Sequence, residues 1–357
     1  MIRIAAQSKT ARFATRKTLA GYDDVIPSMT NSADIVLVGS GAVGQFYAAQ
    51  LIHAGHRLRL LARRDAAILA TRGLVVHQAS VPQVKSSQQF PLLCIEPHRF
   101  EVASDPHILQ RGTPADWVLV ALKTTALEQA RQLVAPFVGA NTRIAILCNG
   151  LGVEDRFAEW FGAERIFGVL CFIGVNRSDD ATIHHVAFGH VSVGHFRDES
   201  DERQRLVRLF ESAGITCEPT ESLLEARWRK LGWNLPFNGL CLLYDCTTDG
   251  IVLCPERRRF ALELAHETVR IGNLDLTAHG QTSRIESAWA ELQLSRTDTM
   301  GAYAPSTLLD ARAPRELEVE TMFLEPLRRA ERLRAEAPAL TRLIAELRTT
   351  GRIANLR

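Results

Sequence analysis

One lysine and two asparagines recur at four-residue spacing within the segment EARWRKLGWNLPFNGLCLL. On a helix, Lys230, Asn234 and Asn238 would lie along one face, whereas the apolar residues between them point in other directions. An ammonium group and two amides are costly to bury unless something polar binds beside them. At such a site an ammonium can polarise a carbonyl group, stabilise a developing alkoxide and donate a proton. The alternative is a polar stripe that faces solvent.

A glycine-rich turn is the second candidate site. In the segment DIVLVGSGAVGQFYAAQL, an apolar strand runs into Gly-x-Gly-x-x-Gly and then into a helix. Gly39 allows the tight turn, Gly41 lets a pyrophosphate approach the backbone, and Gly44 lets the helix pack on the strand. The free N–H groups at the helix N-terminus attract phosphates. A turn without a ligand is the alternative to the predicted dinucleotide site, which consists of Gly39, Ser40, Gly41, Ala42, Val43 and Gly44.

The end of the following strand indicates which dinucleotide binds. NAD-binding chains usually carry Asp or Glu there to hold the ribose 2′-hydroxyl, whereas this chain has Arg63 and Arg64, with Asp65 only later. Two guanidinium groups suit a 2′-phosphate, so we predict that Arg63 holds that phosphate and that the cofactor is NADPH rather than NADH. Solvated surface arginines are the alternative.

Two further polar residues follow predicted strands. Lys123 comes after DWVLVAL, and Asn149 comes after RIAILC. The carboxyl ends of parallel strands share the edge at which doubly wound folds bind ligands, so both residues are candidate cofactor or substrate contacts. For each of them a solvated loop position is an equal alternative.

The elements that position these residues follow from an alternation of short apolar runs with amphipathic segments. Strands are predicted at 34–38, 57–62, 117–121, 143–147 and 166–169, with helices between the first several. This alternation predicts a parallel sheet with helices on both faces. The runs ATIHHVAF and HVSVGHF, which flank Gly189, predict a hairpin added to that sheet.

From residue 201 the pattern changes to long segments with helical periodicity. Ser222 and Glu225 form a capping box, which predicts that a second domain starts close to them. The predicted fold class is therefore α/β: an N-terminal Rossmann-type doubly wound sheet that binds NADP at 33–218, and a C-terminal all-helical domain for substrate binding and catalysis at 219–350. Residues 1–32 are predicted to be a disordered or misassigned leader, with a transit peptide as the alternative.

Composition excludes several classes of function. The 357 residues, 46% of them hydrophobic, are enough for two domains. Because 42 Lys and Arg nearly balance 40 Asp and Glu, no basic field argues for nucleic acid as a partner. No apolar run approaches the ~20 residues that a membrane span needs. The cysteines form no C-x-x-C pair, which favours reduced thiols and a cytoplasmic location.

Several separated motifs resemble those of the ketopantoate reductase (2-dehydropantoate 2-reductase) family, from about residue 34 to about residue 329. GSGAVGQ is similar to the family's glycine turn, ALKTTALEQA to its lysine segment and CNGLG to its asparagine loop. RWRKLGWNLPFN matches its K-x-x-x-N-x-x-x-N helix, and APSTLLD resembles its P-S-M-x-x-D segment. The resemblance implies NADPH-dependent reduction of a 2-keto acid, in particular of 2-dehydropantoate to pantoate in pantothenate and coenzyme A biosynthesis.

The resemblance also implies roles for individual residues. Lys230 falls at the family's proton donor, and Glu318, within ELEVE, falls at its acidic active-site residue. Asn234 and Asn238 would orient the lysine and the substrate, and Ser306 would hold a substrate carboxylate. Arg63 falls at the family's 2′-phosphate arginine, and no metal is expected.

Three positions depart from the family pattern. Cys148 replaces the usual Gln, Thr307 replaces Met, and Thr248 stands about where a substrate-contacting Asn is often found. The identity of the 2-keto acid therefore stays open. One alternative is a related hydroxyacid or 6-phosphogluconate-type dehydrogenase, against which the spacing from Ser306 to Glu318 argues. The other is a non-catalytic NADPH-binding sensor. The sequence does not decide whether the chain forms a homodimer.

Overall fold

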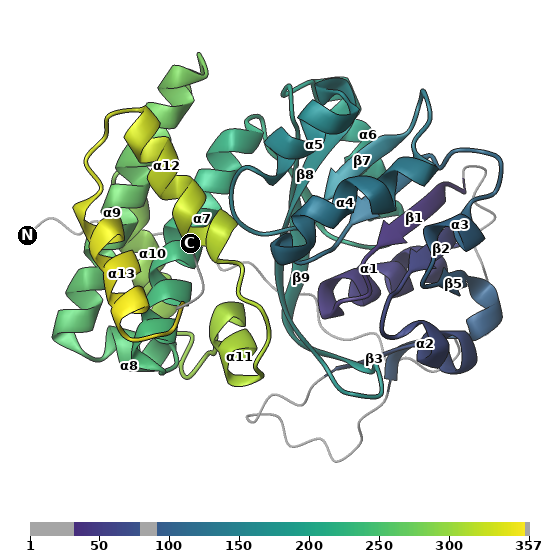
Figure 1. Ribbon diagram of the computed structural model, residues 1–357, viewed down its shortest axis with the longest axis horizontal. Coiled ribbons are helices and arrows are strands. Elements are labelled where there is room, and N and C mark those ends of the chain that lie inside the picture. The colour runs from purple at the N-terminus through teal and green to yellow at the C-terminus, as the bar shows by residue number, and fades with distance from the viewer. Residues whose placement is uncertain (1–31, 79–90, 354–357) are drawn as a thin grey trace, which may run out of the picture.

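The computed structural model of the chain describes residues 32–78 and 91–353. The predicted leader lies outside these residues except for its last position. Figure 1 shows a sheet-containing part, formed by the N-terminal half of the chain, beside a helical part formed by the C-terminal half. Helix α7 (Leu223–Tyr244) begins the helical part and lies on the side that faces the sheet.

The described residues form a 10-stranded mixed sheet with the order β4-β3-β9-β8-β7-β6-β1-β2-β5, and β10 pairs with β9. The β3–β4 and β8–β9 pairs are antiparallel, and the other pairs are parallel. The strands are β1 (Asp34–Val38), β2 (Arg57–Leu61), β3 (Leu74–Gln78), β4 (Pro91–Ile95), β5 (Glu101–Ala103), β6 (Trp117–Val120), β7 (Arg143–Ile146), β8 (Ile166–Arg177), β9 (Ile183–His195) and β10 (Cys217–Pro219).

The predicted strands agree with the sheet at its centre. β1, β2, β6 and β7 end within one residue of their predicted bounds, whereas β8 continues to Arg177, eight residues beyond the predicted end. The α/β class is confirmed. Because the central strands are parallel, the residues that follow β1, β2, β6 and β7 all leave the sheet at one edge.

The hairpin predicted around Gly189 is wrong. The two runs that flank this glycine belong to one strand, β9, which pairs along its length with β8. Ile173 lies opposite Phe188 and Phe172 opposite His190, so Gly189 is the extra residue of a bulge. Its φ of +126° is a conformation that favours glycine. A glycine between two alternating runs therefore marked a bulge and not a turn.

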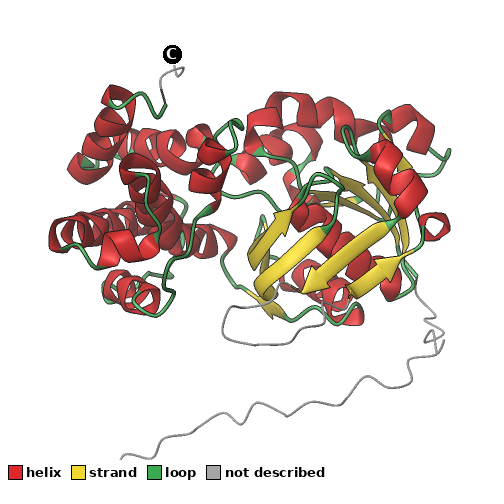
Figure 2. Ribbon diagram, turned by 90° about the horizontal axis from the view of Figure 1, so that it is seen from below, coloured by secondary structure: helices red, strands yellow, loops and turns green. Residues whose placement is uncertain are grey.

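Helices cover both faces of the sheet, as Figure 2 shows. Alternate residues of β1 enter different cores: Ile35 and Leu37 pack in the core that contains α1, and Val36 and Val38 in the core that contains α4 and α5. This is the burial pattern of a strand covered on both sides. The helices of this part are α1 (Ala42–His53), α2 (Ala66–Arg72), α3 (Pro106–Leu109), α4 (Leu127–Val134), α5 (Val153–Phe161) and α6 (Ser200–Ser212).

The helical part has its own apolar core, built around α7 and α9. The predicted cap of α7 is present, because the Ser222 hydroxyl accepts a hydrogen bond from the Glu225 N–H at 3.0 Å. Among the described residues, no helix combines the length and the apolar character needed to cross a membrane. The remaining helices are α8 (Thr248–Val252), α9 (Pro255–Ala278), α10 (Trp289–Thr297), α11 (Ser306–Arg312), α12 (Glu325–Arg332) and α13 (Pro338–Thr349), with a π-helical turn at Glu320–Leu324.

Candidate active site

Lys230 projects from α7 toward β8. Its Nζ donates to the Cys171 carbonyl oxygen at 2.8 Å and lies 5.2 Å from the centre of the Phe172 ring. Burial lowers the pKa of Lys230 to about 8, the nearby Arg227 guanidinium acts in the same direction, and the Glu318 carboxylate opposes both. The ammonium is thus fixed in place by the sheet and is easier to deprotonate than an ordinary lysine.

Asn234 and Asn238 continue the face of α7 that carries Lys230, and both are buried. Asn238 Nδ2 donates to the Asn234 carbonyl oxygen at 3.0 Å, and Asn238 Oδ1 accepts from the Thr307 N–H at 3.2 Å. Ser306 is an exposed residue, and its hydroxyl is 3.5 Å from the same Oδ1. The structure thus brings together Asn238 and Ser306, which lie 68 positions apart in the sequence.

Glu318 connects the two parts of the molecule. Its Oε1 accepts a hydrogen bond from the Thr124 N–H, just after β6, at 2.8 Å. Burial raises the pKa of Glu318, although this hydrogen bond and the charge of Lys123 both oppose the rise. Because Glu318 also affects the pKa of Lys230, the two predicted catalytic residues share one electrostatic environment.

Lys123 lies at the predicted edge of the sheet, but its ammonium is already paired. Its Nζ is 2.6 Å from Asp310 Oδ2 on α11, and it also lies 3.4 Å from the Glu316 carbonyl oxygen. Lys123 therefore contacts the helical part directly across the junction with the sheet.

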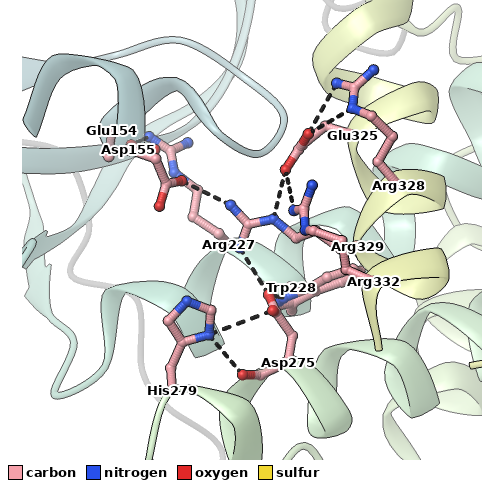
Figure 3. Close-up of polar contacts among 10 residues, drawn as sticks. All are labelled: Glu154, Asp155, Arg227, Trp228, Asp275, His279, Glu325, Arg328, Arg329 and Arg332. Carbon is pink, nitrogen blue, oxygen red and sulfur yellow. Dashed lines mark hydrogen bonds and ion pairs between the residues drawn. The ribbon is translucent and has the colours of Figure 1, made fainter. Parts of the chain in front are cut away.

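Asn149 follows β7 and is partly buried. The loop that carries it is held to α7 by Arg227, whose Nη1 donates to the Cys148 carbonyl oxygen at 2.8 Å. The guanidinium of Arg227 is buried and pairs with Glu154 of α5, as Figure 3 shows. Sequence reasoning missed Arg227, because an arginine three positions before Lys230 looks like part of an exposed basic run. Its only available signal was its place one helical turn before the lysine.

The glycine turn has the geometry that a dinucleotide needs. A Cβ on Gly39 would lie 2.7 Å from the Ala121 carbonyl oxygen, and one on Gly44 would lie 2.5 Å from the Gly39 carbonyl oxygen, so both are required by packing. A Cβ on Gly41 would meet nothing closer than 3.9 Å, which leaves open space in front of the turn. No side chain of the described residues caps the N-terminus of α1, so its N–H groups are available to phosphates.

Arg63 and Arg64 follow β2 and are both exposed. Among the described residues Arg63 makes no ion pair, and Arg64 Nε lies 3.8 Å from Asp65 Oδ1. The turn and Arg63 leave the same edge of the sheet, because β1 and β2 pair with Val38 opposite Leu61. These residues fit a dinucleotide that carries a 2′-phosphate.

The three departures from the family pattern are all buried positions. Thr248 is fully buried, and its hydroxyl donates to the Gly301 carbonyl oxygen at 2.7 Å. The Cys148 thiol lies 3.1 Å from the Leu122 carbonyl oxygen, and burial raises its pKa. Thr307 uses its backbone N–H to hold Asn238. The Thr248 hydroxyl is therefore engaged inside the protein and does not offer the contact that an asparagine would.

Two family models match the chain. The model described as ketopantoate reductase PanE/ApbA matches residues 35–198, and the model described as ketopantoate reductase PanE/ApbA C terminal matches residues 222–350. A curated 2-dehydropantoate 2-reductase from Nostoc sp. is 30% identical over 328 residues, which are 89% of this chain and 95% of that protein.

Solved structures of other proteins are also similar to this chain. The crystal structure of a 2-dehydropantoate 2-reductase from Geobacter metallireducens has a TM-score of 0.79 and 33% identity, over 88% of this chain and 99% of that one. A second one, from Methylococcus capsulatus, has a TM-score of 0.75 and 25% identity, over 90% of this chain and 98% of that one. D-mandelate dehydrogenase in complex with NADH is similar in fold, with a TM-score of 0.73 at 15% identity, over 88% of this chain and 98% of that one.

Proposed function

The chain belongs to the ketopantoate reductase family of oxidoreductases, and from this premise we propose that it reduces 2-dehydropantoate to pantoate with NADPH. The observation that carries the proposal is the ammonium of Lys230, which is held by the Cys171 carbonyl oxygen, on the helix α7 that also carries the buried Asn234 and Asn238. A fixed ammonium suits the protonation of a carbonyl oxygen during reduction.

NADPH bound at the glycine turn would supply the hydride. The N–H groups at the start of α1 would hold its pyrophosphate, and Arg63 its 2′-phosphate. Asn149 lies on the loop that Arg227 fixes to α7, so this loop is a suitable place for a cofactor contact. Lys123 is suited to a second contact at the same edge, although a ligand there would compete with Asp310 for its ammonium.

The helical part would hold the keto acid and its proton donor. Ser306, an exposed residue with its hydroxyl beside Asn238, would bind the substrate carboxylate. Lys230 would polarise the keto oxygen and donate a proton from Nζ. Glu318 would keep Lys230 protonated, since its charge raises the pKa of the lysine against the effect of burial.

The pH dependence of turnover follows from the pKa of Lys230. Burial lowers this pKa from 10.5 to about 8, so the ammonium is present below about pH 8 and is lost above it. We expect kcat for reduction to fall as the pH rises through about 8, because only the ammonium can donate the proton. A pH profile of kcat with saturating substrates measures this. A profile that stays flat up to 10.5 would contradict the role of Lys230.

Cofactor preference is expected to depend on Arg63. We expect NADPH to be preferred over NADH by at least tenfold in kcat/KM, equivalent to ~1.4 kcal/mol, and Arg63→Ala to remove most of that preference. Arg57→Ala is the matched control, because Arg57 is an exposed arginine at the opposite end of β2 and should leave the preference unchanged. Equal use of both cofactors by the unmodified protein would refute the assignment.

NADPH oxidation with a panel of 2-keto acids tests the proposed function. If 2-dehydropantoate has by far the highest kcat/KM, the proposal is supported. If the protein turns over only other keto acids, the reductase mechanism stands but the substrate is not 2-dehydropantoate. A related hydroxyacid dehydrogenase is then the second candidate function. Binding of NADPH without turnover of any keto acid would favour the sensor. We also propose a cytoplasmic location and a role in pantothenate biosynthesis, and the same panel of keto acids tests the role in that pathway.

A further inference from the structure

Asp65, two residues after Arg63, is buried against the glycine turn. Only 6% of its side chain is exposed. Its Oδ2 is 3.4 Å from the Ser40 hydroxyl, within the turn, and 3.4 Å from Gln45 Nε2 on α1. The same oxygen pairs with the guanidinium of Arg177. An aspartate after the second strand is the residue type that NAD-binding sheets use for the ribose hydroxyls, so its placement bears on cofactor choice.

Arg177 reaches this carboxylate from a distant segment. It is the last residue of β8, 112 positions after Asp65, and 16% of its side chain is exposed. The hairpin that follows β8 is fixed to α2 by a second ion pair, in which Arg72 Nη1 is 2.5 Å from Asp180 Oδ2. The end of the β8–β9 hairpin therefore lies over the segment that connects β2 to α2.

The charge of Asp65 decides what this edge of the sheet attracts. A carboxylate without a counter-ion would repel a 2′-phosphate and would accept hydrogen bonds from free ribose hydroxyls, which is the environment that selects NADH. Arg177 removes both effects, because it balances the charge and occupies the carboxylate oxygen. The exposed Arg63, which makes no ion pair among the described residues, then keeps its full attraction for a phosphate, whereas Arg64 is a highly exposed and more distant partner of the same carboxylate, with its Nε 3.8 Å from Asp65 Oδ1.

We propose that Arg177 determines cofactor specificity by neutralising Asp65 and holding its carboxylate against Ser40 and Gln45, so that it neither repels a 2′-phosphate nor accepts from free ribose hydroxyls. Arg177 acts on the cofactor through Asp65, so it is a positioning residue. The inference rests on the proposed function in one respect, since it takes the glycine turn as the dinucleotide site.

The test compares the dissociation constants of NADPH and NADH, measured by nucleotide fluorescence without any keto acid. For Arg177→Met we expect the ratio of the NADH constant to the NADPH constant to fall by at least about tenfold, mainly because NADPH binds more weakly. Arg177→Lys should keep most of the preference, since it keeps the charge. If Arg177 has only a structural role, Arg177→Met would weaken the binding of both nucleotides equally and leave the ratio of the two dissociation constants unchanged.

Two further variants separate charge from folding. In the double variant Arg177→Met with Asp65→Asn, the uncompensated carboxylate is gone, so we expect the preference for NADPH to return. Arg72→Met removes the other arginine that holds the same hairpin and should not change the ratio. If Arg177→Met fails to fold, Asp65→Asn alone decides: the preference should stay or rise, and a fall would overturn the inference.

The outcomes distinguish this inference from the function on which it rests. If the unmodified protein prefers NADPH and Arg177→Met keeps the ratio, the inference is wrong and the proposed function stands. If the unmodified protein binds both nucleotides equally, there is no preference for Arg177 to determine, and the assignment of NADPH fails together with the inference.

Discussion

Lys230→Ala is expected to lower turnover by at least ~10²-fold while NADPH binds with unchanged affinity. The ammonium is held by the sheet, at 2.8 Å from the Cys171 carbonyl oxygen, and the charge of Glu318 raises its pKa against the effect of burial. Steady-state kinetics with saturating keto acid and a separate titration of NADPH measure the two quantities.

Two other variants are controls for Lys230. Lys230→Arg should not restore turnover, because a guanidinium keeps its proton near neutral pH and has a different shape. Asn238→Ala should act mainly on the KM of the keto acid, since Asn238 lies beside Ser306, the proposed ligand of the substrate carboxylate, and accepts from the Thr307 N–H. Near-normal turnover in Lys230→Ala would move the proton donor elsewhere, and Lys123 would be the next residue to test.

Arg329→Met is expected to destabilise the protein by about 3–5 kcal/mol, the range for removal of one partner from a buried ion pair. The Arg329 side chain is 5% exposed and donates to Asp275 at 2.8 Å, to Asp155 at 2.8 Å and to Glu325 at 3.0 Å. These acids lie on α9, α5 and α12, so the network in Figure 3 joins the helical part to α5 of the sheet-containing part. Asp275 would lose its main counter-ion in the interior.

Arg332→Met is the matched control for Arg329. Arg332 pairs with the same Glu325 at 3.0 Å, but 59% of its side chain is exposed, so its removal should cost less than about 1 kcal/mol. The loss of stability in each variant is measured from the midpoint of urea unfolding. Two transitions are fitted if the two parts of the molecule unfold separately. Equal midpoints for the two variants would show that the buried network contributes little.

Local sequence patterns predicted the parts of the fold that depend on local physics. The run of apolar residues before Gly39 and the capping box at Ser222 each specify an element from within a few residues, and both elements are present. The common face of Lys230, Asn234 and Asn238 follows from helix geometry alone. No tertiary contact is needed to predict that these three side chains lie on one helix face.

Local sequence patterns do not predict which distant side chains pair in the folded protein. Arg177 meets Asp65 across 112 positions, and Arg227 meets Glu154 across 73, with no motif that connects them. The Gly189 bulge was misjudged because alternating residues look the same on either side of a turn and of a bulge. Thr248 looked like an altered pocket residue, but its hydroxyl is turned to the Gly301 carbonyl, a contact that depends on a distant loop.

If Lys230 protonates the keto oxygen while hydride from NADPH reaches the keto carbon, transfer of an isotope from the cofactor to the product will follow both events. The protein is incubated with 2-dehydropantoate and NADPH in which both hydrogens at the reactive ring carbon are deuterium, and the product is analysed by mass spectrometry. We expect pantoate that carries one deuterium on the carbon of the new alcohol, formed at least ~10²-fold more slowly by Lys230→Ala. Pantoate without deuterium, or no hydroxy acid from any 2-keto acid while NADPH binds, would contradict this mechanism.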